Sequence, residues 1–164
     1  MKLLPARVVV DQLDTLRHAT THRVLAGDYG WLYVVPVLVG IAAGIWGVPH
    51  VETGNLLAAV AVLPGLIFNL SFSVFDKSLQ IRRDPIQSAD PIIVTLVEEL
   101  RANVNYTVLV GIILTGVLAS ASLFSSNTFA DVSTGLIAGL MAHMLLMCAM
   151  VLKRFGSLHD AMKP

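Results

Sequence analysis

One histidine of this chain is surrounded by potential soft metal ligands. His143 lies near the middle of a long apolar segment, with Met144 and Cys148 close by and Met147 one helical turn further on. Imidazole, thioether and thiol groups bind copper(I), and histidine or methionine can ligate haem iron. The methionines recur at every third residue and therefore drift around a helix instead of sharing one face. The alternative is a neutral imidazole hydrogen-bonded between helices, and the sequence predicts no cofactor.

Uncharged polar side chains also occur inside apolar segments. Asn69 and Ser73 are four residues apart, and Thr115 and Ser120 belong to a later segment. Such groups could line the path of an ion through a small oligomeric channel. More often such groups form hydrogen bonds between helices, each contributing about 0.6 kcal/mol. The sequence favours these hydrogen bonds and leaves the channel as the alternative.

The chain has four long apolar segments, at residues 29–48, 56–75, 104–124 and 132–152. None of them contains an Asp, Glu, Lys or Arg that could take part in catalysis. Proton-coupled transporters use a titrating carboxylate at membrane depth. The sequence also lacks a histidine box, a Gly-x-Ser-x-Gly elbow and a phosphate-binding loop. Asp14, His18 and His22 recur at intervals of four. Two histidines at this spacing can chelate a metal ion, but the sequence offers no further ligand to complete the site, so we interpret these residues as a solvated helix face. These absences predict a protein that is not an enzyme.

The apolar segments themselves point to a membrane protein. Of the 164 residues, 55% are hydrophobic and only 13% are charged, which is too apolar for an ordinary soluble domain. Each segment approaches the length of about 20 residues that crosses a bilayer core of about 30 Å. We predict an all-α fold with four transmembrane helices in two hairpins. The expected organisation is an amphipathic cytoplasmic helix in 1–28, a first hairpin in 29–75 with spans at Tyr29–Val48 and Leu56–Phe75, a cytoplasmic connection in 76–103, a second hairpin in 104–152 with spans at Val104–Phe124 and Val132–Leu152, and a basic tail in 153–164.

The basic residues indicate the orientation. All eleven Lys and Arg lie in the N-terminal segment, the central stretch and the C-terminal tail, whereas the two short turns carry only Glu52 and Asp131. By the positive-inside rule, both termini and the central stretch face the cytoplasm. Short outer turns and the lack of a sorting segment favour the plasma (inner) membrane of a bacterium. The formal net charge of zero gives no reason to expect nucleic acid as a partner.

Local signals set several helix boundaries. Asp90-Pro91 is an aspartate N-cap followed by proline at the first helical position, and nothing interrupts the helix before Ser125. Pro36 predicts a kink in the first span, which is tolerated if a neighbour satisfies the carbonyl that it frees.

Two cytoplasmic helical faces are expected to be apolar. In the N-terminal segment, Val9 and Leu13 fall on one side of a helix over residues 6–26, with Asp11 and Asp14 opposite. At the start of the third long helix, an apolar stripe is flanked by charges. This stripe is expected to pack on the N-terminal helix or to receive a soluble partner. Its residues are Ile93, Leu96, Val97 and Leu100, with Glu99 and Arg101 beside them.

Glycines recur at a spacing of four in two of the spans. The pairs are Gly40 with Gly44 and Gly135 with Gly139. Small residues at this spacing let two helices approach closely, within one chain or between copies. Because four helices have little interior, we expect at least one pair to mediate formation of a homo-oligomer.

These features favour a non-catalytic, oligomeric membrane subunit over an enzyme. We expect it to sense or act on the lipid bilayer and to couple to a cytoplasmic protein, as membrane components of bacterial stress or phage-defence systems do. The alternatives are a small oligomeric ion channel and a haem or copper protein that uses His143.

Overall fold

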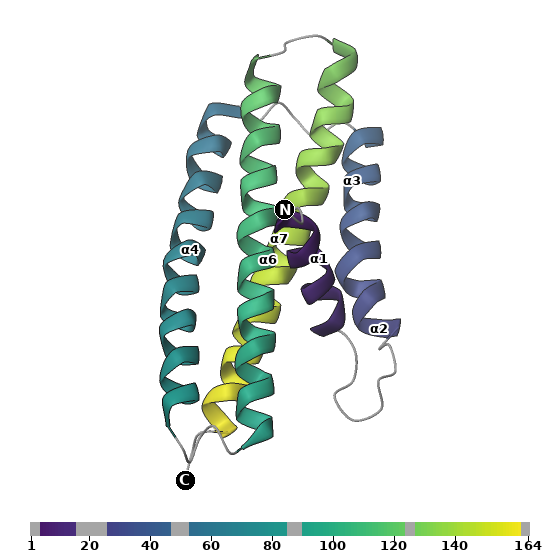
Figure 1. The fold of residues 1–164 in the computed structure, drawn as a ribbon. Helices are drawn as coiled ribbons and strands as arrows, with labels where there is room; N and C mark the ends of the chain where they lie inside the picture. The colour runs from purple at the N-terminus through teal and green to yellow at the C-terminus, as the bar shows by residue number, and fades with distance from the viewer. Residues whose placement is uncertain (1–3, 16–25, 47–52, 85–89, 124–126, 162–164) are drawn as a thin grey trace.

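The computed structural model of the protein describes residues 4–15, 26–46, 53–84, 90–123 and 127–161 (Figure 1). The expected all-α class is confirmed, since the described residues contain no strand. Two predictions concern residues outside these ranges. They are the solvated face with His18 and His22, and most of the first outer turn near residue 50. The helices are α1 (Leu4–Thr15), α2 (Ala26–Tyr29), the π-helical segment η1 (Gly30–Val34), α3 (Val35–Trp46), α4 (Thr53–Arg83), α6 (Pro91–Leu123) and α7 (Asn127–Ala161).

Three of the helices are long and apolar enough to cross a membrane, which identifies the chain as suited to membrane insertion. The qualifying stretches are Leu56–Arg83, Pro91–Leu123 and Val132–Ala161. The first predicted span corresponds to a shorter apolar helix, Gly30–Trp46.

The order of the helices in space differs from their order in the sequence. In Figure 1, α6 and α7 lie at the centre, with α4 on one side and α3 on the other. α4 packs against α6 and α3 packs against α7, and the described residues of α3 and α4 do not approach each other. The first predicted hairpin therefore consists of two helices that are joined in sequence but separated by the central pair.

The long helices continue beyond the boundaries set by their charges. α4 ends at Arg83 instead of Phe75, and α7 ends at Ala161 instead of Leu152. α7 also begins at Asn127, so the predicted outer turn of 125–131 is shorter. The expected connection and basic tail are thus largely helical. The reason is that apolar residues such as Ile81 and Leu158 continue the helical repeat and are buried.

The start of α6 agrees with the sequence. The backbone N–H of Ile92 donates to Asp90 Oδ1 at 2.8 Å, as expected of an aspartate near a helix N-terminus. Thirty-three residues then follow without interruption to Leu123. At about 1.5 Å per residue, this helix is about 50 Å long and exceeds the thickness of a bilayer core.

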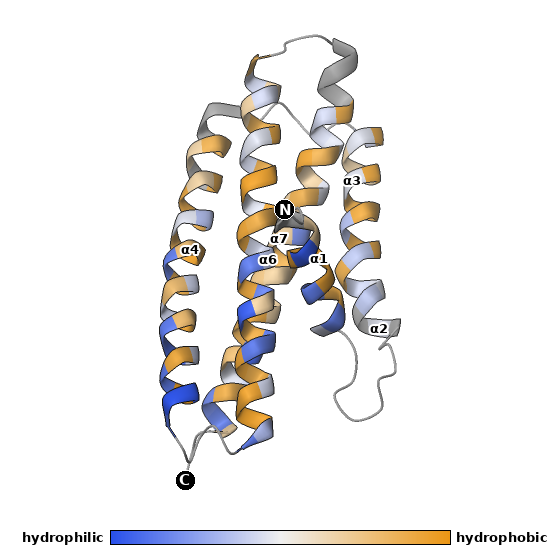
Figure 2. Cartoon of the chain, in the orientation of Figure 1, coloured by the Kyte–Doolittle hydropathy of each residue, from blue (hydrophilic) through white to orange (hydrophobic). Residues whose placement is uncertain are grey.

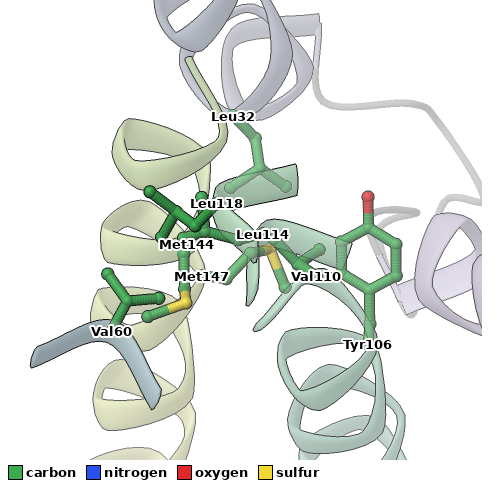
Figure 3. Close-up of a cluster of buried hydrophobic side chains, with 8 residues drawn as sticks. All are labelled: Leu32, Val60, Tyr106, Val110, Leu114, Leu118, Met144 and Met147. Atoms are coloured by element: carbon green, nitrogen blue, oxygen red, sulfur yellow. The ribbon is translucent and has the colours of Figure 1, made fainter. Parts of the chain in front are cut away.

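The molecule divides into an apolar half and a charged half, visible as orange and blue regions in Figure 2. We define the charged half as residues 76–84, 90–103 and 153–161, and the apolar half as the parts of α3, α4, α6 and α7 on the other side of these segments. Each half has a cluster of buried side chains. The cluster of the apolar half is formed by Leu32, Val60, Tyr106, Val110, Leu114, Leu118, Met144 and Met147 (Figure 3). The second cluster, centred on the charged half, is formed by Val74, Ile81, Ile93, Val97, Leu100, Val104, Val151 and Leu158.

The two glycine pairs face each other across the contact of α3 with α7. A Cβ atom added to Gly40 would lie 2.8 Å from the carbonyl oxygen of Gly135, and one added to Gly135 would lie 2.7 Å from that of Gly40. Gly44 and Gly139 extend the same contact. Both pairs are therefore used inside one chain. The expectation that one pair also mediates association between copies stays a prediction, since Gly40, Gly44 and Gly139 are only partly buried and line an open groove.

The N-terminal helix buries a different face from the predicted one. Gln12 and Thr15 are buried, while Val9 and Val10 are exposed. α1 packs on α6, where its neighbours are polar groups as well as apolar ones. Of the predicted faces, Asp11 and Asp14 are exposed as expected, whereas the apolar side is only partly covered, with Leu13 half-buried and Val9 exposed.

Candidate functional site

A row of polar groups runs between α6 and α7 where the apolar half meets the charged half. We call it the polar seam. On α6 its members recur at the spacing of one helical face, and α1 and η1 supply further groups. The members are Glu99, Asn103 and Tyr106 of α6, His143 and Arg154 of α7, Gln12 and Thr15 of α1, and the Leu32 carbonyl of η1.

His143 forms the part of the polar seam at membrane depth. Its Nδ1 lies 2.9 Å from the carbonyl oxygen of Leu32, and its Nε2 lies 3.0 Å from the hydroxyl of Tyr106. Leu32 is four residues before Pro36, which has no N–H to donate to it in a helix. His143 therefore satisfies the carbonyl that the proline frees, as the sequence required of some neighbour.

The partners of His143 define its tautomer. A carbonyl oxygen only accepts, so Nδ1 carries the proton donated to Leu32. In the neutral ring, Nε2 then accepts from the Tyr106 hydroxyl. Both ring nitrogens are thus engaged, and a copper or haem ligand role would require breaking one of these bonds. No three His, Cys, Asp or Glu side chains cluster as metal ligands in the described ranges. The arrangement matches the alternative interpretation of a histidine hydrogen-bonded across helices.

Arg154 forms the part of the polar seam in the charged half. Its guanidinium forms a salt bridge with Glu99 of α6 and donates to the backbone carbonyl of Thr15 at 2.7 Å. The side chains of Arg154 and Glu99 are only 15% and 20% exposed. Arg154 thereby joins three helices, whereas the Arg82–Glu98 pair on the surface joins two and is about half exposed.

Between these two ends, α1 inserts its buried polar side chains. Gln12 Nε2 lies 3.9 Å from the sulfur of Met147, and Thr15 Oγ1 lies 3.5 Å from Asn103 Oδ1. The Asn103 amide itself donates to the carbonyl of Glu99 at 2.8 Å. The polar seam therefore joins α1, η1, α6 and α7 along the border between the two halves.

The predicted docking stripe is mostly inside the protein. Ile93, Val97 and Leu100 are buried against residues of α4 and α7, not against the N-terminal helix. Leu96 is half-buried, and Glu99 is held by Arg154. The expected packing partner was wrong because α4 and α7 extend into the charged half. Among the predicted docking residues, Arg101 lines an open groove, described below.

The predicted pore residues are not brought together by one chain. Asn69 and Ser73 are exposed on α4, and Ser73 donates to the carbonyl of Asn69. Thr115 and Ser120 of α6 likewise donate at 2.8 Å to the carbonyls of Gly111 and Gly116 in their own helix. These hydroxyls satisfy themselves locally instead of forming the expected bonds between helices.

A polar groove lies beside the polar seam. It has a volume of about 620 Å³ and is lined by residues of α1, α4 and α6. Its lining carries charges of both signs and is mainly acidic. The charged residues are Asp11, Asp14, Glu98, Glu99, Arg7 and Arg101.

Comparison of the chain with protein-family models, curated proteins and solved structures finds no match.

Sequence reasoning found His143 and Glu99 but missed the residues that join them to other helices. Tyr106, Arg154, Gln12 and Thr15 were not singled out. One signal was available: Pro36 marks the carbonyl of Leu32 as needing a donor, and His143 is a buried donor in a facing span. No such signal indicated the contacts of α1 with α6, because the two helices are far apart along the chain.

Proposed function

We propose that the chain is a non-catalytic, integral membrane subunit that transmits the state of the bilayer to a soluble partner. In this proposal η1 and α3 form a fourth span, and both termini and the charged half lie in the cytoplasm of a bacterial cell. The positive-inside rule supports this orientation, since the basic residues gather on one side.

The observation that carries the proposal is the continuity of three helices between the two halves. α4, α6 and α7 each run without a break from the apolar half into the charged half. A rigid helix conveys a tilt or rotation at one end to its other end. A change in bilayer thickness, which tilts transmembrane helices, would therefore rearrange the charged half.

The polar groove supports contact with a soluble partner. It faces water in the proposed orientation, and its mainly acidic lining suits a protein surface of complementary charge. It also borders α1 and α6, so a partner bound there would contact the polar seam. The proposed subunit forms a homo-oligomer, and the open side of the contact between α3 and α7, lined by Gly40, Gly44 and Gly139, is one apolar face available for it.

The coupling is tested by measuring distances between spin labels in reconstituted protein. Labels replace Arg83 at the end of α4 and His159 near the end of α7, both exposed, in a background where Cys148, the single cysteine, is changed to Ala. We expect the mean distance to change by about 1–2 Å, the size of typical helix shifts, between bilayers of short-chain and long-chain phosphatidylcholine. A control pair at Leu152 and His159, both on α7, should not respond. An unchanged distance between α4 and α7 in all bilayers contradicts the proposal.

The partner surface is tested by cross-linking in cells. A photoreactive residue at Thr95, which is exposed and lines the polar groove, should cross-link to a soluble protein. The same residue at Arg83 lies outside the groove and is the matched control. Equal cross-linking at both positions, or none at Thr95, argues against docking in the groove.

A further inference from the structure

We propose that the protein binds one anionic phospholipid in a second groove, formed by α7, η1 and α6 at the border of the two halves. The inference rests on the membrane insertion in the proposed function but not on the coupling to a soluble partner. The groove has a volume of about 380 Å³. This is within the range of about 300–1,000 Å³ found for small-molecule sites.

The lining of this groove changes character along its length. One face of α7 supplies Leu146 and Met150 toward the apolar half, then Lys153 and Ser157 toward the charged half. These four residues recur at the three- and four-residue spacing of a single helix face. From Leu146 to Ser157 the helix rises about 16 Å. The groove therefore offers an apolar end at hydrocarbon depth and a cationic, hydroxyl-bearing end at headgroup depth.

The cationic end of the groove carries side chains that can bind an anion. Lys153 is exposed and forms no ion pair within the described ranges. The Ser157 hydroxyl donates to the Lys153 carbonyl over 3.2 Å and can rotate toward another acceptor. The neighbouring Arg154 lines the groove, but its charge is paired with Glu99. A phosphate oxygen supplies a negative charge for Lys153 and a hydrogen-bond acceptor for the Ser157 hydroxyl.

The rim of the groove fits the same occupant. Trp31 of η1 borders it and is 69% exposed. Tryptophan is enriched at the level of lipid headgroups because its ring is apolar and its N–H is polar. A molecule with a hydrocarbon end, an anionic end and this orientation is a phospholipid of the leaflet on the charged side. Basic pockets between membrane helices on that side are known to hold acidic headgroups.

Binding is tested with the full chain purified and delipidated in a neutral detergent. Native mass spectrometry measures the affinity for phosphatidylglycerol, phosphatidylcholine and glycerol phosphate. We expect one phosphatidylglycerol to bind about tenfold more tightly than phosphatidylcholine, because its phosphate is not neutralised by a choline. Glycerol phosphate, which lacks the acyl chains, should bind weakly. Equal binding of both lipids, or glycerol phosphate binding as tightly as phosphatidylglycerol, overturns the proposal.

Two variants locate the bound lipid. Lys153→Gln with Ser157→Ala should abolish the preference for phosphatidylglycerol, whereas Arg83→Gln, which removes a charge outside the groove, should keep it. Ala149→Trp changes no charge but fills the apolar part of the groove from an exposed position. It should lower the affinity for phosphatidylglycerol about tenfold. Since all positions are exposed, circular dichroism should show unchanged helicity. An equal loss in Arg83→Gln, or no loss in Ala149→Trp, contradicts the assignment.

The measurement separates this proposal from the previous one. It uses detergent and no soluble partner, so lipid binding persists even if the spin-label distances prove insensitive to bilayer thickness. Conversely, the distances can respond to thickness in a protein that shows no preference between lipids.

Discussion

The apolar half and the charged half of this protein are held together in different ways, although the same three helices run through both. In the apolar half, α3 and α7 approach until backbone touches backbone at Gly40 and Gly135. In the charged half, aliphatic side chains such as Ile81, Val97 and Leu158 fill the space between helices. The outer surfaces differ too, since apolar side chains such as Trp46 and Leu123 are highly exposed in the first half.

We attribute the difference to the solvent that each half meets in the proposed orientation, lipid for the apolar half and water for the charged half. Lipid chains are as apolar as leucine, so burying leucine gains little inside a bilayer, and close backbone packing and hydrogen bonds must hold the helices together. In water, burial of an aliphatic side chain contributes about 1.5–3 kcal/mol. Both halves contain a cluster of buried apolar side chains, but the charged half shows no close backbone contact at its described glycine, Gly156. The polar seam lies where one mode of packing replaces the other.

The largest expected effect tests the backbone contact in the apolar half. Gly135→Ala places a methyl group 2.7 Å from the carbonyl oxygen of Gly40, and neither backbone can move aside easily. Overpacking costs about 1–3 kcal/mol, against a gain of about 1 kcal/mol in helix propensity. In Gly116→Ala, the added Cβ atom has no neighbouring atom within 4 Å, so this variant should show only the gain in helix propensity. Denaturant unfolding in micelles should separate the two variants by about 1–3 kcal/mol, the cost of overpacking, and equal stabilities would show that the helices are not in contact.

A smaller effect tests the charged half. Arg154→Met leaves Glu99 without its partner and removes the bond to the Thr15 carbonyl. Breaking a fully buried pair costs about 3–5 kcal/mol, and partial exposure reduces this to about 1–2 kcal/mol. Arg82→Met, in a pair that is about half exposed, should cost about 0.5 kcal/mol or less. The same unfolding assay compares them, and a larger loss in Arg82→Met would contradict the role given to the polar seam.

The smallest effect tests the bonds of His143. His143→Phe keeps an aromatic ring but removes both hydrogen bonds, which at about 0.6 kcal/mol each predicts a loss of about 1 kcal/mol. A double-mutant cycle with Tyr106→Phe isolates one of them. We expect a coupling energy of about 0.5 kcal/mol between the two positions. Full additivity would mean that the Tyr106 bond does not contribute to stability.

Much of the fold could be predicted because some signals are local. Asp90-Pro91 indicated the start of α6. Pro36 indicated that the carbonyl of a preceding residue, Leu32, needed a hydrogen-bond donor from another helix, and His143 supplies it. The ends of α4 and α7 were missed because charges mark where a helix leaves the membrane and not where it stops. The buried face of α1 was missed because its neighbours on α6 include Asn103, so polar residues turn inward. Hydropathy also does not indicate which apolar helices pack against each other. The separation of α3 from α4 could therefore not be predicted from the sequence.

That separation has a consequence for how the protein is made. α3 and α4 leave the ribosome before either of the helices that they will contact. In the membrane protein that we propose, they do not pair on insertion as a hairpin would, because each packs against a helix made later. Packing of α4 begins only when α6 has been made and packing of α3 only when α7 has been made, and a chain truncated before α6 should be a target for membrane proteases.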